Sequence, residues 1–138
     1  MTENEEQQFR ECIFRECIQR GSELYVAQRY RAACDMFTNA LRIDPEHTTA
    51  LNYRIGALEA LERYDDAVAD YKKLIEICEA GIQKAKNDKN GLLCFSWQDS
   101  MVKYLNNLGF CYREMYKYAS ADECFSRAEL LEKEMFSR

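Results

Sequence analysis

Apolar residues recur with helical spacing in three segments of this chain. The segments begin at Tyr30, Tyr64 and Tyr118, and each carries apolar or aromatic residues three, seven and ten positions further on. These offsets place the side chains on one face of an α-helix. The matching positions are Ala33, Ala67 and Ala121, then Phe37, Tyr71 and Phe125, then Ala40, Leu74 and Ala128. Because small residues alternate with rings, two helices can approach closely at one level and interlock at the next.

A second periodic stretch precedes each of the three segments. These stretches read "CIQRGSELYVAQ", "LNYRIGALEALE" and "YLNNLGFCYREM". Each unit therefore predicts a helix, a tight turn and a second helix. Because such hairpins repeat along the chain, we expect a solenoid, in which each hairpin buries its apolar face against the next.

The units resemble the tetratricopeptide repeat (TPR), a family with a period of about 34 residues. Residues 14–47 match its pattern at Gly21, Tyr30, Ala33, Phe37, Ala40 and Pro45, and residues 102–135 match at Leu108, Gly109, Tyr112, Tyr118, Ala121, Phe125 and Ala128. Residues 48–81 match at Tyr64, Ala67 and Tyr71 but depart from the pattern at Ile55 and Leu74. The resemblance implies an all-α fold of three TPR hairpins in a right-handed α-solenoid. We expect residues 1–138 to form a single domain.

An insertion at about residues 82–101 separates the second repeat from the third. The stretch "EICEAGIQKAKN" continues a helical pattern, the Asn-Gly pair in "NDKNG" indicates a helix end, and "LLCFSWQDSMVKYLNNLGF" predicts a long following helix. We therefore expect elongated helices around this connection, forming an antiparallel arm. The arm carries Leu92, Leu93, Phe95 and Trp97, which either pack within the protein or offer an aromatic anchor to a partner.

Both ends of the sequence also carry helical patterns. The stretch "TENE" has the form of a capping box with Thr2 as the cap, which predicts a first helix that begins near Glu3. We expect its extra turns to cover another part of the protein, with the arm as the candidate. Near the other end, four apolar residues follow helical spacing, namely Leu130, Leu131, Met135 and Phe136. We expect no further helix of this sequence to cover them. With Phe95 and Trp97 they form a predicted second interface, through which the chain could form a homo-oligomer.

Charge and cysteine content narrow the class of protein. The net charge is −5 and lysine and arginine form no long cluster, which argues against nucleic acid or a membrane surface as the partner. No apolar run is long enough to span a membrane. The chain has 7 cysteines without a CxxC pair and no secretory signal pattern. We therefore expect reduced thiols and a cytoplasmic location.

The sequence shows no motif for catalysis or for metal binding. Its one histidine, His47, follows "DPE" and is expected to be a solvated residue in a turn. Phosphate-binding glycine motifs are missing, and no Cys/His pairs are spaced for zinc. We expect no enzymatic activity, metal or cofactor, so a catalytic or metal-binding protein is the least favoured class.

The resemblance implies a binding module instead. In TPR arrays the first helix of each repeat lines a groove that takes an extended peptide or a partner helix. We therefore predict an adaptor or scaffold in a protein complex, which binds its partner through this groove and through exposed helical faces. Matching the groove positions repeat by repeat gives Arg15, Ile18, Ser22, Tyr25, Thr49, Asn52, Tyr53, Lys103, Asn106, Asn107, Phe110 and Arg113.

The alternative is a TPR co-chaperone with a divergent peptide groove. Some such co-chaperones hold the acidic tails of heat-shock chaperones with a two-carboxylate clamp. The clamp positions here hold Ile18, Ser22, Tyr53, Lys103 and Asn107. Only Lys103 matches, and one lysine cannot neutralise two carboxylates. Binding of acidic chaperone tails is therefore not expected.

Overall fold

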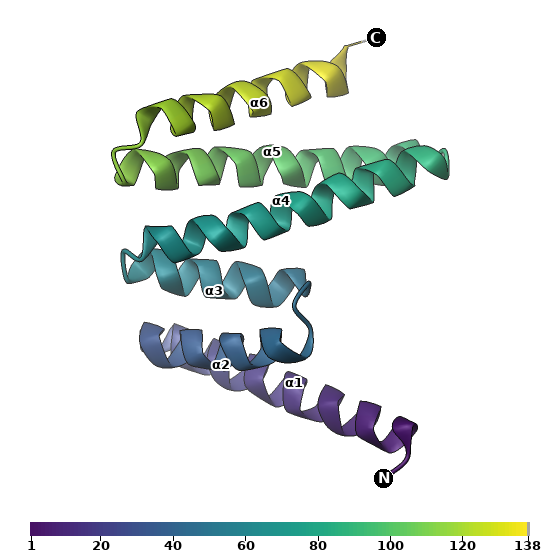
Figure 1. Ribbon diagram of the computed structural model, residues 1–138, viewed down its shortest axis with the longest axis vertical. Coiled ribbons are helices and arrows are strands. Elements are labelled where there is room, and N and C mark those ends of the chain that lie inside the picture. The colour runs from purple at the N-terminus through teal and green to yellow at the C-terminus, as the bar shows by residue number, and fades with distance from the viewer. Residues whose placement is uncertain (138) are drawn as a thin grey trace. The chain divides into compact units, whose positions relative to one another are not determined.

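The computed structural model describes residues 1–137, which form six helices and no strand (Figure 1). The predicted all-α fold of helical hairpins is thereby confirmed. The helices are α1 (Glu3–Val26), α2 (Tyr30–Ile43), α3 (Thr48–Ala60), α4 (Tyr64–Asn87), α5 (Gly91–Glu114) and α6 (Tyr118–Phe136).

The chain folds as two compact units, and the division falls within α4. Unit 1, Met1–Ala67, contains α1, α2, α3 and the first turn of α4. Unit 2 begins at Val68 and contains the rest of α4 together with α5 and α6. The single domain and the right-handed solenoid depend on how the two units are arranged, so both stay predictions.

Four of the five connections between helices are built alike. Gln28, Glu62, Lys89 and Tyr116 each adopt a left-handed backbone conformation, with φ between 55 and 62°. The amide of the following residue donates a hydrogen bond to the carbonyl five residues earlier. For example, the backbone N of Asn90 donates to the carbonyl O of Ala85 at 2.9 Å. This bond belongs to the Schellman motif that ends many helices. The connection between α4 and α5 is therefore the same kind of hairpin turn as those inside the repeats.

The elongated helices predicted around the insertion are confirmed. Helices α4 and α5 have 24 residues each, whereas α2 has 14 and α3 has 13. In Figure 1 the far ends of α4 and α5 run side by side to the turn that joins them. At 1.5 Å per residue, each of the long helices spans about 36 Å.

The residues that end α4 differ from those predicted. Its end within "NDKNG" is confirmed, but the Asn-Gly pair does not take the left-handed position, which falls on Lys89. Asn90 instead caps α5, since its Oδ1 accepts a hydrogen bond from the backbone N of Leu93 at 3.1 Å. Gly91 is the first residue of α5. The pair therefore starts the second helix of the arm.

The predicted start of α1 at Glu3 is confirmed. Thr2 caps the helix, because its Oγ1 accepts a hydrogen bond from the backbone N of Glu5 at 3.1 Å. Eleven residues of α1 then precede the residue where the matched repeat begins. The prediction that these extra turns cover the arm stays a prediction.

Burial confirms the register assigned to the repeats. Ala33 and Ala67 are 0% exposed and Ala121 is 1% exposed. In the first and third repeats, a ring also lies on a glycine of the preceding helix. A Cβ atom built on Gly21 would lie 2.5 Å from Cε1 of Phe37, and one built on Gly109 would lie 2.6 Å from Cε1 of Phe125. The ring takes the space that any side chain would need.

His47 has a structural role that the sequence analysis missed. We predicted a solvated turn residue, which is wrong: His47 is half-buried and is the N-cap of α3. Its Nδ1 accepts a hydrogen bond from the backbone N of Ala50 at 3.3 Å. Its ring also lies against Phe14, with the ring centroids 4.6 Å apart. The histidine therefore starts α3 and joins it to α1.

This cap predicts a simple substitution series. His47→Ala removes the acceptor for the amide of Ala50 and is expected to lower the free energy of unfolding by about 1 kcal/mol. His47→Asn keeps a cap acceptor and is expected to recover a good part of this loss. Urea unfolding followed by circular dichroism gives both values. Equal losses in the two variants would show that the Phe14 contact, not the cap, carries the contribution of His47.

Candidate partner-binding surfaces

The structure leaves the predicted groove residues accessible. Seven of them belong to unit 1, on α1 and α3, and five belong to α5 in unit 2. The exposed members are Arg15, Thr49, Asn52, Lys103, Asn107, Phe110 and Arg113, and the half-buried members are Ile18, Ser22, Tyr25, Tyr53 and Asn106. Every one of the twelve positions can therefore be reached by a partner.

In unit 1 the structure brings two of these residues together. Tyr25 of α1 and Tyr53 of α3 meet edge to face, with ring centroids 6.2 Å apart. Tyr53 also stacks on buried Phe37, with the ring centroids 5.1 Å apart and an interplanar angle of 7°. Tyr30 contacts Tyr25 at 5.5 Å, which the sequence analysis did not predict. We call Tyr25, Tyr30 and Tyr53 the tyrosine cluster.

The position of Tyr25 depends on a glycine in α3. A Cβ atom built on Gly56 would lie 2.8 Å from Oη of Tyr25 and 3.2 Å from its Cε2. The missing side chain thus lets the phenol lie directly on the α3 backbone. Because its ring is held from two sides, Tyr25 can offer a rigid surface at low entropic cost on binding.

The groove residues of unit 2 form a different surface. Phe110 is 54% exposed, and its ring contacts Phe125 at 5.4 Å. Lys103, the one residue that matched the clamp for acidic tails, forms an ion pair with Asp99 of the same helix at 3.1 Å. Its charge is therefore partly neutralised within α5.

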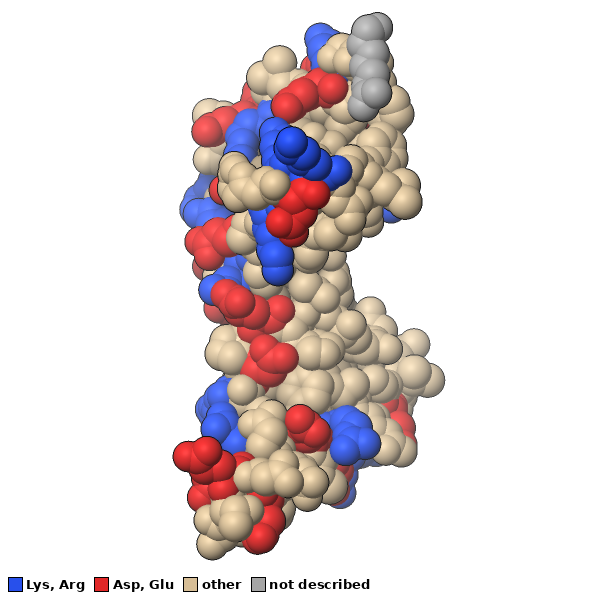
Figure 2. All heavy atoms as spheres, turned by 90° about the vertical axis from the view of Figure 1, so that its right-hand side faces the viewer, with Lys and Arg blue, Asp and Glu red and all other residues tan. Residues whose placement is uncertain are grey.

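Two residues of the predicted second interface meet in unit 2. Phe95 of α5 and Phe136 of α6 meet edge to face, with centroids 5.6 Å apart. Phe136 is 71% exposed and Leu130 is 65% exposed, whereas Leu131 and Met135 are half-buried. Trp97 points elsewhere, since its indole lies on Gly81 of α4. Figure 2 faces this end of unit 2, and its upper right part shows few charged side chains.

Two buried thiols are harder to ionise than an ordinary cysteine. Burial raises the pKa of the Cys78 thiol from 9.0 to about 11, and burial is also the main cause of the raised pKa of Cys124. A protonated thiol is a poor nucleophile and a poor metal ligand. Within residues 1–137, no group of three or more His, Cys, Asp or Glu residues is placed to hold a metal ion. All seven cysteines are outside disulfides.

Comparison with known proteins supports the family predicted from the sequence. Residues 56–80 match a family model described as the tetratricopeptide repeat. No curated protein matches the chain. Two similar solved structures are "MamA RS-1 ArsTM double mutant" and "MamA 41-end from Desulfovibrio magneticus RS-1". Both are 19% identical with a TM-score of 0.46, and the alignments cover 91% and 90% of this chain and 78% of each of those chains.

The predicted resemblance is thereby confirmed: residues 56–80 match the tetratricopeptide-repeat model, and the described helices form helical hairpins. A TPR fold indicates a protein–protein interaction module, and proteins of this family are generally scaffolds without catalytic activity. Among the helices described, none is both long and apolar enough to cross a membrane.

Proposed function

We propose that this chain is a non-catalytic adaptor in a cytoplasmic protein complex. It holds an extended peptide or a helix of a partner protein on the accessible face of α1 and α3, centred on the tyrosine cluster. The chain needs no cofactor for this role, and its partner is neither nucleic acid nor a membrane. The unit 2 residues Lys103, Asn106, Asn107, Phe110 and Arg113 contribute further contacts to the partner.

The meeting of Tyr25 and Tyr53 carries this proposal. Two half-exposed phenol rings from different helices lie edge to face, and buried Phe37 supports one of them. Such rings supply apolar area and a hydroxyl group, which is why tyrosine is enriched at the centre of protein interfaces. Four other predicted groove positions of unit 1 are polar, namely Arg15, Ser22, Thr49 and Asn52. An aromatic centre with a polar rim is the usual composition of an interface.

Affinity capture with quantitative mass spectrometry tests the proposal. Thr49→Arg places a long charged side chain on the exposed side of α3, one turn from Tyr53, without altering the core. We expect it to reduce recovery of the specific partner by about tenfold or more, as expected when a hot spot is disrupted. Arg113→Ala should cause a smaller loss, because most contacts outside a hot spot contribute little to the binding energy.

A matched control uses the other tyrosine pair of the chain. Tyr116 and Tyr118 are exposed, and their ring centroids lie 6.5 Å apart. They lie at the turn between α5 and α6, outside the tyrosine cluster. Replacing both by serine should leave capture unchanged. Equal capture by wild type and Thr49→Arg, or equal losses in Thr49→Arg and the double serine variant, would refute binding at the tyrosine cluster.

We also propose that unit 2 mediates self-association through the residues around Phe95 and Phe136. Leu130→Glu with Phe136→Glu places two charges on this apolar surface and is expected to convert an oligomer into a monomer. Light scattering of the wild type and the variant measures the difference. A wild type that is monomeric at high concentration would rule out this part of the proposal and would leave the tyrosine cluster unaffected.

A further inference from the structure

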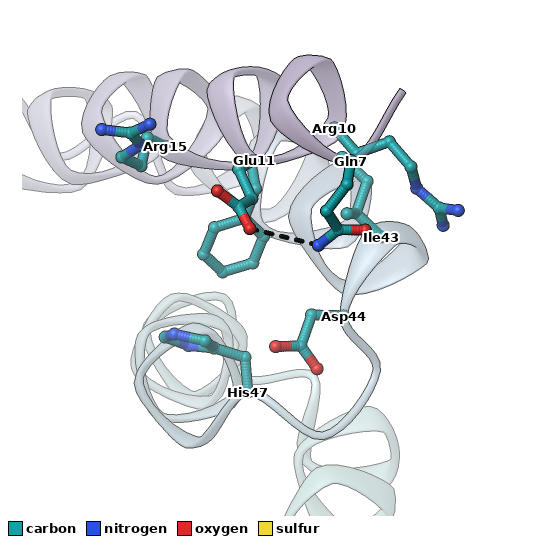
Figure 3. A pocket seen from close by; sticks show the side chains of 8 residues that line it. Gln7, Arg10, Glu11, Arg15, Ile43, Asp44 and His47 are labelled. Carbon is teal, nitrogen blue, oxygen red and sulfur yellow. Dashed lines mark hydrogen bonds between the residues drawn. The ribbon is translucent and has the colours of Figure 1, made fainter. Parts of the chain in front are cut away.

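A cleft lies between the first half of α1 and the connection from α2 to α3 (Figure 3). Its volume is about 530 Å³, and it is lined by Gln7, Arg10, Glu11, Phe14, Arg15, Ile43, Asp44 and His47. One wall includes turns of α1 that precede the matched repeat. The opposite wall contains the cap of α3. The cleft shares only Arg15 with the predicted groove.

The floor of the cleft is formed by rings and an aliphatic side chain. Phe14 and His47 contact each other with centroids 4.6 Å apart and an interplanar angle of 55°, and Ile43 lies beside them in the lining. All three are half-buried, so part of each remains accessible. His47 Nδ1 accepts a hydrogen bond from the backbone N of Ala50, which holds the imidazole ring in this position.

Two carboxylates face each other across this floor. Figure 3 shows Glu11 on the α1 side and Asp44 on the opposite side, beside His47. Glu11 accepts a hydrogen bond from Gln7 at 3.1 Å, and Asp44 accepts one from the backbone N of Glu46 at 3.4 Å. An ionised carboxylate can accept about four hydrogen bonds. Both groups therefore have acceptor capacity left for a ligand.

The two arginines in the lining do not occupy the space between these carboxylates. In Figure 3 the guanidinium groups of Arg10 and Arg15 extend toward opposite sides of the view, away from the centre where Glu11 and Asp44 lie. The centre of the cleft is therefore acidic above an aromatic floor, which is complementary to a cation with a flat face.

We propose that this cleft binds an arginine side chain presented by a segment of a partner protein. The planar guanidinium stacks on the Phe14 and His47 rings, as such groups do on aromatic faces. The N–H groups at its edges donate hydrogen bonds to the carboxylates of Glu11 and Asp44. A guanidinium can form such paired hydrogen bonds in one plane, whereas the ammonium group of lysine cannot. The methylene stem of the arginine covers Ile43. This site lies outside the tyrosine cluster and adds a second point of attachment for a partner.

Nuclear magnetic resonance titration of the whole chain tests the site directly. The probe is a capped heptapeptide, Gly-Ser-Gly-Arg-Gly-Ser-Gly, compared with peptides that carry citrulline, lysine or glutamate in place of arginine. We expect the arginine peptide to shift amide signals within residues 11–15 and 43–47. Citrulline has the same shape without the charge and should bind at least about tenfold more weakly. Equal shifts with citrulline, or stronger binding of the glutamate peptide, would overturn the proposal.

Charge-neutral variants locate the binding groups without disturbing the fold. Asp44→Asn and Glu11→Gln keep their shape and their hydrogen bonds within the chain, and each is expected to weaken binding of the arginine peptide about tenfold. Asp35→Asn, at an exposed carboxylate of α2, is the matched control and should change nothing. Arg10→Gln should leave binding unchanged or strengthen it. A loss in Asp35→Asn equal to that in Asp44→Asn would show only a general attraction to an acidic protein and would overturn the site.

Discussion

Replacing Phe37 by alanine is expected to lower the free energy of unfolding by about 3–5 kcal/mol. Phe37 is 0% exposed, and its ring lies between Gly21 on α1 and Tyr53 on α3. Removing it leaves a cavity where three helices of unit 1 meet, and the backbone at Gly21 has no side chain that could fill the space. The loss of buried apolar area and the cavity both lower the free energy of unfolding.

Phe9→Ala is the matched control, since it removes the same atoms from an exposed position of the same unit. Phe9 is 59% exposed on α1, so its loss should change stability by less than about 0.5 kcal/mol. Urea unfolding followed by circular dichroism measures both variants. A small effect for Phe37→Ala would contradict the assigned repeat register. The same variant should also weaken partner binding, because Tyr53 would lose the ring on which it stacks.

The second large effect is expected at the contact between α4 and α5. Trp97 is the only tryptophan, and a Cβ atom built on Gly81 would lie 2.5 Å from its Cδ2. Trp97→Ala should lower the free energy of unfolding by roughly 2–4 kcal/mol, somewhat less than for a fully buried indole. Gly81→Ala should also destabilise, because overpacking costs about 1–3 kcal/mol and exceeds the helix propensity that alanine adds.

The double variant gives the sharper test of this contact. Once Trp97 is alanine, the methyl group at position 81 no longer meets a ring, so Gly81→Ala should stabilise by about 0.5–1 kcal/mol. Gly81→Ala is thus expected to destabilise the protein when Trp97 is present and to stabilise it when Trp97 is replaced by alanine. Unfolding of all four proteins by urea, followed by circular dichroism, measures the coupling. Additive effects would show that the indole does not rest on Gly81 in solution.

The helices were predictable from the sequence because their signals are periodic and local. The spacing of Ala33 and Phe37 sets one face of α2, and Thr2 marks the start of α1 through its own hydroxyl group. The length of the arm followed from a helical pattern without an early stop. The hairpin turns were harder, since non-glycine residues such as Lys89 adopt the left-handed conformation there. The Schellman hydrogen bonds offset the conformational cost of the left-handed backbone. The residue type at such a position therefore gives no signal of the turn.

The contacts between side chains of different helices were not predictable. Tyr25 meets Tyr53 because Gly56 leaves space on α3, and that relation depends on the rotamer that Tyr25 adopts. Histidine is an uncommon helix cap, so His47 carried no signal of its role at α3 or of the cleft beside Phe14. Trp97 could equally have faced solvent, and only its packing on Gly81 shows otherwise.

Site-specific photo-crosslinking measures most directly whether the tyrosine cluster is the partner-binding surface. A p-benzoylphenylalanine residue is placed at Thr49, on the exposed side of α3 beside the cluster, and in a second protein at Asp35, exposed on α2. The account predicts a crosslink to the captured partner from position 49 and none from position 35. A crosslink from position 35 alone, or equal crosslinking from both positions, would contradict it.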